Sequence, residues 1–305
     1  MIEHDASREP EGLIFDLDTF AVHDGPGIRM AVYLKGCPLA CIWCHSPESQ
    51  SPGPELAFAR DRCTGCGTCV RVCPNGVHRL GDDGSHVIER DRCMVCGRCA
   101  EACLTGALSI KGYLISAAAI VAQAERLRPF FDGSGGGITL TGGEVTMQPE
   151  FATAVLAGCR ALNIHTAVET CGACSWSQLE AVLKQTDLVL YDLKLMDEEM
   201  HRRWTGGSNR AILRNLARLA GRNVQVRVPL IPGITDTDEN LRCTFDFMVR
   251  AGLSSVALLP YNASAGAKYQ WLDLPYTIAG EPQSQARLNS LVAMAREAGL
   301  EAVID

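Results

Sequence analysis

The feature that most constrains this chain is the spacing of three cysteines near its N-terminus. Cys37, Cys41 and Cys44 follow a C-x3-C-x2-C pattern within residues 35–48, KGCPLACIWCHSPE. A tetrahedral zinc usually takes four protein ligands, and a 4Fe-4S cube takes one thiolate per iron. Three closely spaced cysteines therefore leave one metal position without a cysteine from this loop. A structural zinc site completed by the adjacent His45 is the alternative.

Eight further cysteines form an internal repeat with a period of about 30 residues. In the bacterial ferredoxin pattern, the fourth cysteine of each motif binds the other cluster. The repeat therefore predicts two 4Fe-4S clusters, and a pair of zinc knuckles is the alternative. Leu104 replaces the proline of the second motif without removing a ligand. The predicted ligands are Cys63, Cys66, Cys69 and Cys103 for one auxiliary cluster, and Cys93, Cys96, Cys99 and Cys73 for the other.

Composition narrows the class of protein. The chain has 305 residues, 47% of them hydrophobic, which is enough for one barrel-sized domain with an insertion. Its 15 cysteines point to metal binding in a reducing compartment. A net charge of −7 argues against nucleic acid as the main partner. The N-terminus has no apolar signal segment and no stretch is suited to span a membrane, so we expect a cytoplasmic monomer.

The pattern of elements outside the cysteine repeat alternates between strands and helices. This alternation predicts an α/β fold, a partial (β/α)6 parallel barrel with an inserted ferredoxin-like domain. We divide the chain into 1–59 as the first part of the barrel, 60–110 as the two-cluster insertion, and 111–305 as the rest of the barrel. Strands are expected at 13–20, 28–34, 137–140, 164–169, 188–192, 224–229 and 255–259, and helices at 116–131, 151–162, 176–184, 198–204, 210–219 and 283–297, with another ending at 249.

Polar groups follow four consecutive strands of this pattern. In parallel α/β folds, ligands bind beyond the carboxyl ends of the strands, so we expect these groups to share a site. Each also has an ordinary structural interpretation: Lys194 as a solvated lysine at a helix start, Arg227 as a strand arginine in an ion pair, and Asp192 as a helix N-cap. The strand-end groups are Gly142, Gly143, Glu144, Glu169, Thr170, Asp192, Lys194 and Arg227.

These motifs together resemble a known family. The cysteine loop followed by Gly142-Gly143-Glu144 resembles the radical S-adenosylmethionine (SAM) enzymes. The full set of motifs resembles the glycyl radical enzyme activating enzymes, in the subgroup with an inserted two-cluster domain. That set comprises Asp24-Gly-Pro-Gly-Ile-Arg29, Gly36-Cys37-x3-Cys41-x-Trp43-Cys44, the double cysteine motif, Gly142-Gly143-Glu144, Asp192-Leu193-Lys194, the run from Arg227 to Asp236, and Leu258-Leu259-Pro260-Tyr261.

The resemblance implies a cofactor set and a role for each strand end. A 4Fe-4S cluster on Cys37, Cys41 and Cys44 would hold SAM at its open iron, and the cysteine repeat would bring the total to three clusters. Glu144 and the glycine carbonyls would contact the methionine amino group, and Lys194 and Arg227 would contact the cofactor. Glu169, Thr170 and Asp192 would surround a monovalent cation. No catalytic side chain is expected beyond the cluster-bound cofactor.

The resemblance also implies the reaction. One electron cleaves SAM, and the resulting 5′-deoxyadenosyl radical removes hydrogen from a backbone glycine of a partner glycyl radical enzyme. Flavodoxin or ferredoxin is the expected electron donor. A radical SAM enzyme acting on a small molecule and a non-enzymatic electron carrier are the alternative functions.

Some residues keep open interpretations. Cys171 and Cys174 form an isolated C-x2-C pair, which we interpret as structural although a redox role is the alternative. Ser46 and Asn262 stand where many relatives carry Asn and His, respectively. Neither change removes a cluster ligand, so no role is assigned to either residue.

Overall fold

The main body of the protein is one sheet of nine strands flanked by helices. The computed structural model describes residues 9–305, so the start of the N-terminal segment lies outside the described residues. The strand order is β13-β12-β11-β10-β9-β8-β2-β1-β7. In chain order these strands are β1 (Glu11–Ala21), β2 (Arg29–Leu34), β7 (Tyr113–Ser116), β8 (Gly137–Gly142), β9 (His165–Thr170), β10 (Leu188–Asp192), β11 (Val224–Pro229), β12 (Ser255–Leu259) and β13 (Glu301–Ile304).

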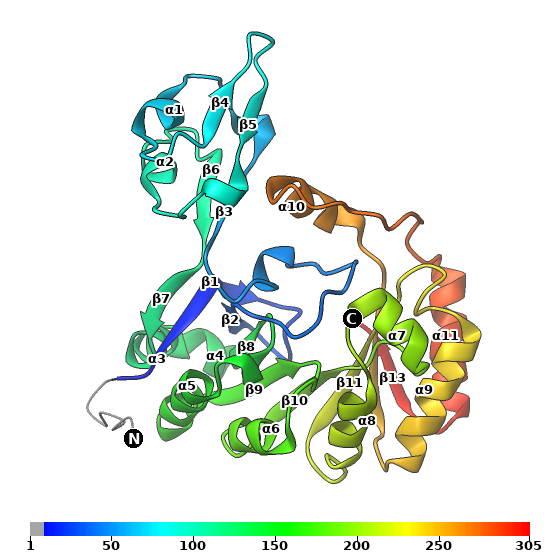
Figure 1. Cartoon of the computed structure of the whole chain (residues 1–305). Helices are drawn as coiled ribbons and strands as arrows, with labels where there is room; N and C mark the ends of the chain where they lie inside the picture. Colours follow the sequence, from blue (N-terminus) through cyan, green and yellow to red (C-terminus); the bar gives the residue numbers. More distant parts are fainter. Residues whose placement is uncertain (1–8) are drawn as a thin grey trace, which may run out of the picture.

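Each neighbouring pair among β2, β8, β9, β10, β11, β12 and β13 is parallel. Strand β1 is antiparallel to both of its neighbours, β2 and β7. The sheet curves and carries most of its helices on the outer side (Figure 1). Within residues 9–305, no helix is both long and apolar enough to cross a bilayer. The helices of this body are α3 (Ala117–Arg126), α4 (Arg128–Ser134), α5 (Pro149–Ala161), α6 (Trp176–Leu183), α7 (Glu198–Thr205), α8 (Arg210–Ala217), α9 (Asp238–Arg250), α10 (Gly266–Trp271) and α11 (Gln285–Glu297).

The main core lies between the sheet and these helices. Strands β2 and β8 are buried along almost their whole length, as expected for parallel strands covered on both faces. By contrast, β1 has mixed burial because it lies near the antiparallel side of the sheet. The carboxyl ends of β8, β9, β10 and β11 therefore meet at one edge of a rigid, buried layer.

The helix expected at 116–131 is two helices in the structure. Ser116 caps the first by accepting a hydrogen bond from Ala119 N at 3.2 Å. Pro129 lies in the first turn of the second helix. Proline has no backbone N–H, so a continuous helix would lose a hydrogen bond and clash at this position. The chain instead ends α3 at Arg126 and begins α4 at Arg128.

A smaller unit interrupts the main body between β2 and β7. Its strands β3 and β6 pair antiparallel, from Glu55 opposite Lys111 to Phe58 opposite Leu108. A second hairpin, formed by β4 and β5, lies between the two cysteine motifs, and Figure 1 shows the unit projecting from the sheet beside α10. Its buried residues form a core separate from that of the main body. Its elements are β3 (Glu55–Phe58), α1 (Thr68–Val72), β4 (His78–Leu80), β5 (His86–Ile88), α2 (Arg98–Glu101) and β6 (Leu108–Lys111).

Two arginines of this unit contact the C-terminal part of the chain, and both bind the Asp273 carboxylate. Arg60 and Arg90 occupy equivalent positions in the repeated sequence Arg-Asp-Arg-Cys. Arg60 Nη2 lies 2.8 Å from one oxygen of Asp273, and Arg90 Nε lies 2.7 Å from the other. Arg90 also donates to the carbonyl oxygen of Trp271 at 2.9 Å. Equivalent arginines from the two copies of the repeat therefore bind the same side chain, Asp273, which follows α10.

Candidate functional site

The three-cysteine loop follows β2 and is closed by hydrogen bonds between its two ends. Gly36 N donates to Ser49 O at 2.7 Å, and Cys37 N donates to Gln50 O at 3.2 Å. The Gln50 side chain then reaches back into the loop and donates to Cys41 O at 3.3 Å. The loop is therefore a closed unit in which the backbone positions of the cysteines are fixed.

Lys35 lies under this loop and is only 1% exposed. Its Nζ donates to Glu48 O at 2.6 Å and to the Glu55 carboxylate at 2.8 Å. Lys268, from α10, donates to His45 O at 3.0 Å. Both lysines therefore bind backbone carbonyls of the loop, and Lys35 also joins it to the first strand of the inserted unit.

The end of α7 supports the other side of the loop. Ala40 N donates to Thr205 O at 2.7 Å, and Ile42 N donates to Trp204 O at 3.2 Å. These two bonds lie on either side of Cys41 and hold the middle of the loop against a helix end.

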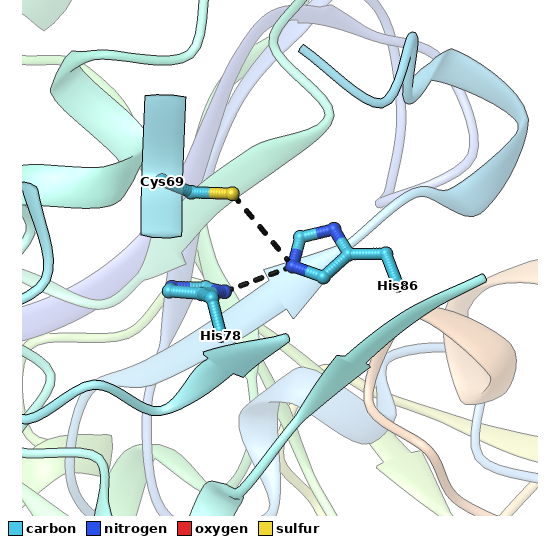
Figure 2. Close-up of side chains that lie close together, drawn as sticks. All are labelled: Cys69, His78 and His86. Carbon is cyan, nitrogen blue, oxygen red and sulfur yellow. Dashed lines mark hydrogen bonds between the residues drawn. The ribbon is translucent and has the colours of Figure 1, made fainter. Parts of the chain in front are cut away.

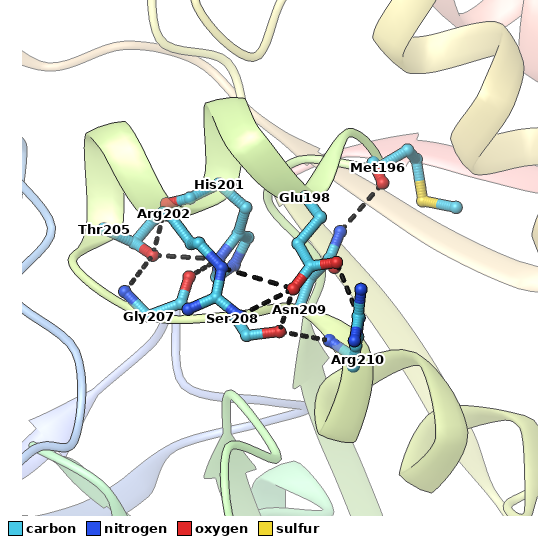
Figure 3. A network of polar contacts seen from close by, with 9 residues as sticks. All are labelled: Met196, Glu198, His201, Arg202, Thr205, Gly207, Ser208, Asn209 and Arg210. Atoms are coloured by element: carbon cyan, nitrogen blue, oxygen red, sulfur yellow. Dashed lines mark hydrogen bonds and ion pairs between the residues drawn. The ribbon is translucent and has the colours of Figure 1, made fainter.

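Behind that helix end lies a polar network around Glu198 (Figure 3). The Glu198 carboxylate accepts hydrogen bonds from Arg202 at 2.7 Å, from Ser208 Oγ at 2.8 Å and from Arg210 at 2.6 Å. These donors, Arg202 foremost, lower the pKa of Glu198 to about 2. The network ties the start of α7 to the start of α8 and thereby fixes the helix that supports the loop.

The loop cysteines lie in a buried environment. Burial raises the pKa of Cys41 to about 12 and that of Cys44 to about 11. Cys37 differs because the thiol of Cys171 donates a hydrogen bond to it, which lowers the pKa of Cys37. Metal binding at Cys41 and Cys44 must therefore displace thiol protons, as at other thiolate sites.

The paired glycines after β8 approach another backbone closely, but that backbone belongs to the protein itself. A Cβ on Gly142 would lie 2.4 Å from Leu34 N, and Gly142 has φ +102. A Cβ on Gly143 would lie 2.1 Å from Gly36 O. Glycine is required at both positions so that this turn can pack against the start of the cysteine loop.

Glu144 joins the ends of two neighbouring strands and is fully buried. Its Oε1 accepts hydrogen bonds from Thr146 N at 3.2 Å, from Thr146 Oγ1 at 2.8 Å and from Thr170 Oγ1 at 2.7 Å, whereas its Oε2 accepts one from Cys171 N at 2.8 Å. Each carboxylate oxygen has about two acceptor positions, so Oε2 retains capacity for one further donor. The carboxylate fixes the β8 and β9 ends relative to each other.

Glu169 and Arg227 form an ion pair across the ends of β9 and β11. Thr141 Oγ1 donates to the second oxygen of the same carboxylate. Burial raises the pKa of Glu169, while the positive charge of Arg227 acts in the opposite direction. Arg227 Nη2 also lies 3.8 Å from Asp305.

Asp192 and Lys194 follow β10 between these two strands. Lys194 Nζ lies 3.0 Å from Asp192 Oδ2. Burial disfavours the charged amine, but the Asp192 carboxylate and the nearby thiols Cys41 and Cys171 outweigh it, so the pKa of Lys194 is raised. Lys194 therefore stays cationic beside the cysteine loop.

Two buried polar atoms at these strand ends have no hydrogen-bond partner within residues 9–305. They are Asp192 Oδ1 and Arg227 Nε. An unpaired buried acceptor or donor is costly, and each is normally matched by a partner. An unpaired acceptor and an unpaired donor thus lie on adjacent strands near the three-cysteine loop. These are the features of a site that a polar ligand completes.

The eight cysteines of the inserted unit line two cavities. Their grouping is crossed between the two sequence motifs, because each cavity takes three cysteines from one motif and the fourth from the other. One cavity is lined by Cys63, Cys66, Cys69 and Cys103, and the other is lined by Cys73, Cys93, Cys96 and Cys99.

Several residues near these sites were given no role in them by the sequence analysis, although Cys171 was noted there as half of an isolated C-x2-C pair. Cys171 lies beside Cys37, and its position directly after a strand-end glutamate and threonine was the available signal. His78 and His86 had no motif around them, yet both are buried next to the cavities. Ser46 makes no capping side-chain bond, whereas Asn262 accepts a hydrogen bond from Ser264 N at 2.9 Å.

Comparison with known proteins shows the family to which this chain belongs. The family described as the radical SAM superfamily matches residues 32–247. The chain belongs to the radical SAM superfamily. Membership implies a 4Fe-4S cluster and SAM, and the open-cornered cysteine loop beside unpaired polar atoms fits both groups.

Individual relatives show which kind of radical SAM enzyme this chain resembles. This radical SAM chain is 43% identical over 262 residues to the trans-4-hydroxy-L-proline dehydratase activating enzyme of Clostridioides difficile, covering 84% of this chain and 86% of that protein. It is 41% identical to the isethionate sulfite-lyase activating enzyme of Oleidesulfovibrio alaskensis, covering 94% and 96%, respectively. It is 39% identical to the choline trimethylamine-lyase activating enzyme of the same organism, covering 95% and 96%. The chain is an activating enzyme of the glycyl radical enzyme type.

Proposed function

We propose that this enzyme uses Cys37, Cys41 and Cys44 to hold a 4Fe-4S cluster, that SAM occupies the open iron, and that a backbone glycine of a partner glycyl radical enzyme loses hydrogen. The proposal rests on the convergence of the three-cysteine loop with the ends of β8 to β11, where Asp192 Oδ1 and Arg227 Nε have no partner within the described residues. When bound, the cluster would supply the one electron that cleaves SAM to methionine and a 5′-deoxyadenosyl radical.

Each residue of the site would make a different contact with SAM. Glu144, supported by Gly142 and Gly143, presents its remaining acceptor position to the methionine amino group. Lys194 stays positively charged beside the cysteine loop, where it neutralises cofactor charge. Arg227 offers its unpaired Nε as a donor. These contacts orient SAM without general acid or base chemistry.

Three oxygen-bearing residues give the site a place for a monovalent cation. Glu169, Thr170 and Asp192 lie on the ends of the adjacent strands β9 and β10. Asp192 Oδ1 has no partner within the described residues. Hard cations prefer carboxylate and hydroxyl oxygens, so these groups are suitable ligands. The cation would balance carboxylate charge next to the SAM carboxylate.

The inserted unit, residues 60–110 carried on the β3–β6 stalk, holds two further 4Fe-4S clusters in this proposal. The crossed grouping of cysteines around the two cavities supports this ligand assignment. Flavodoxin or ferredoxin would deliver electrons through the unit to the cysteine loop. Cys63→Ala or Cys96→Ala should then slow SAM cleavage more with such a donor than with a small chemical reductant, and equal slowing would contradict the relay.

The partner is a protein, and its identity is a separate question. The relatives are named for a dehydratase, a sulfite-lyase and a trimethylamine-lyase, so the shared architecture serves different partners. The monomeric state and the cytoplasmic location remain predictions from the sequence.

The SAM site is tested by anaerobic reconstitution of the full chain with iron and sulfide. Three clusters require about twelve irons per chain, and loss of one cluster removes about four. We expect Cys37→Ala to lose about four irons and all 5′-deoxyadenosine formation, whereas Cys243→Ala, at an exposed cysteine outside the motifs, should lose neither. Full 5′-deoxyadenosine formation by the Cys37 variant would contradict the proposal.

A further inference from the structure

Two buried histidines face each other inside the inserted unit (Figure 2). His78 lies on β4 and His86 on β5, at diagonal positions of the hairpin, since Ile88 is opposite His78 and Leu80 is opposite His86. His78 Nδ1 lies 3.0 Å from His86 Nε2. Their exposed fractions are 2% and 4%, so one imidazole is the direct partner of the other in a closed interior.

Each imidazole lies at a different cysteine cavity. His86 lines the cavity of Cys63 and Cys69, with Nδ1 3.7 Å from the first sulfur and Nε2 3.7 Å from the second. His78 lines the cavity that contains Cys73, and its Nε2 is buried without a hydrogen-bond partner within the described residues. The pair therefore spans the wall between the two cavities, and its one unpaired nitrogen belongs to the side chain lining the second cavity.

Proton counting shows what such a pair can donate. Each neutral imidazole carries one N–H, and one of the two N–H groups forms the bond between the rings. If His78 donates that bond, the remaining N–H is on His86 Nδ1, next to Cys63. If His86 donates it, the remaining N–H is on His78 Nε2, at the other cavity. A neutral pair thus offers one N–H donor to one cavity at a time.

The rest of the second cavity offers one other side-chain N–H donor, the amide of Asn75, whose Nδ2 already donates to Arg92 O at 3.1 Å. Besides His78 and Asn75, the lining consists of cysteines, glycine, proline and the apolar residues Leu56, Val77, Met94, Val95 and Ile110. Hydrogen bonds to the sulfurs of an iron-sulfur cluster are one of the factors that set its reduction potential. A donated N–H stabilises the more negative, reduced state, so the recipient cluster becomes easier to reduce.

We propose that His78 and His86 form a hydrogen-bonded bridge between the two auxiliary clusters and that the bridge raises the reduction potential of the cluster that receives its free N–H. This inference rests on the proposed assignment of two clusters to the inserted unit. The pair acts as positioning residues for electron transfer: an electron on one cluster favours the arrangement that donates to that cluster, so the two clusters are not reduced independently.

The first test uses the wild-type chain labelled with ¹⁵N-histidine, reconstituted anaerobically and reduced. Pulsed electron paramagnetic resonance should detect ¹⁵N coupling to a reduced auxiliary cluster. Iron analysis on the same sample separates this inference from the proposal on which it rests. About twelve irons without any ¹⁵N coupling would overturn the bridge alone, whereas about four irons would contradict both. One tightly bound zinc per chain on Cys69, His78 and His86 would also overturn the bridge.

The second test measures potentials in variants of the full chain. His86→Leu removes both nitrogens, His86→Gln keeps an N–H donor, and Val87→Ala changes the exposed neighbour on the same strand. At a fixed potential, we expect His86→Leu to lower the reduced-to-oxidised ratio of an auxiliary cluster about tenfold, which equals about 59 mV for one electron. His86→Gln should recover part of this change, and Val87→Ala should show none. Unchanged ratios in a fully loaded His86→Leu protein would overturn the proposal, and the labelled wild-type sample decides if that variant fails to load.

Discussion

Lys194 Nζ lies 3.0 Å from Asp192 Oδ2 at the end of β10, while the other oxygen of the same carboxylate is buried without a partner within the described residues. Asp192 Oδ2 therefore holds Lys194 beside the cysteine loop, and Oδ1 is available to a ligand. This division makes Asp192 the most informative carboxylate of the site.

Asp192→Asn should weaken SAM binding. The change keeps the shape of the side chain but removes its charge, and a hydrogen bond to a charged group contributes about 1.5–3 kcal/mol. We therefore expect at least a tenfold higher dissociation constant for SAM, measured by calorimetry on the reconstituted enzyme. Asp246→Asn, at an exposed position of α9, is the matched control. Equal affinity in the two variants would exclude a ligand role for Asp192.

Arg227→Met should destabilise the fold as well as the site. It would leave Glu169 as a buried carboxylate without its cation, and breaking a buried ion pair in this way costs about 3–5 kcal/mol. The free energy of unfolding, from urea titration at neutral pH, measures the loss. Arg242→Met removes an exposed arginine from α9 and should have little effect. A loss no larger than that of the control would show that Glu169 does not depend on Arg227.

Glu198→Gln should give a stability deficit that depends on pH. The hydrogen bonds from Arg202, Ser208 and Arg210 lower the pKa of Glu198 from 4.5 to about 2. A lowered carboxylate pKa stabilises the folded state above the unfolded pKa, and this stabilisation is lost as pH falls toward the folded pKa. The deficit should therefore be full at pH 7 and smaller at pH 3. Urea midpoints at the two pH values, with exposed Glu297→Gln as control, test it; a constant deficit would be inconsistent with this network.

Asp273→Asn should loosen the attachment of the inserted unit. Asp273 has a positive φ of 56, which asparagine tolerates, so the change removes charge without straining the backbone. Losing the carboxylate removes the shared partner of Arg60 and Arg90. We expect faster amide hydrogen exchange around Arg90 and Trp271, measured by mass spectrometry. Asp82→Asn, exposed in the hairpin turn, should leave exchange there unchanged. Identical exchange in both variants would show that the carboxylate does not hold the unit.

The sequence was sufficient wherever the signal was local or repeated. Strand ends could be located from apolar runs, and parallel strands bring their carboxyl ends to one edge, so Glu144, Glu169, Asp192 and Arg227 were expected at a common site. The structure brings them together in that way. The crossed grouping of the eight repeat cysteines was likewise expected from spacing alone.

What the sequence could not supply depends on contacts between distant segments. Strand β13 is a short terminal run that becomes a strand by pairing with β12. Cys171 acquires its significance from Cys37, which is far away along the chain. His78 and His86 become a pair only because a hairpin places them diagonally. Pro129 was a readable signal for the break in the helix expected at 116–131, since proline interrupts a helix at a predictable place.

The reaction of this radical SAM enzyme ends with a radical on a glycine of another protein. The most direct measurement is electron paramagnetic resonance of an anaerobic mixture of the reconstituted enzyme, SAM, a reductant and a candidate glycyl radical enzyme. We expect a glycine-centred doublet that requires SAM and disappears with Cys37→Ala. Absence of the doublet with every candidate partner encoded in the same genome, together with turnover of a small-molecule substrate, would contradict it.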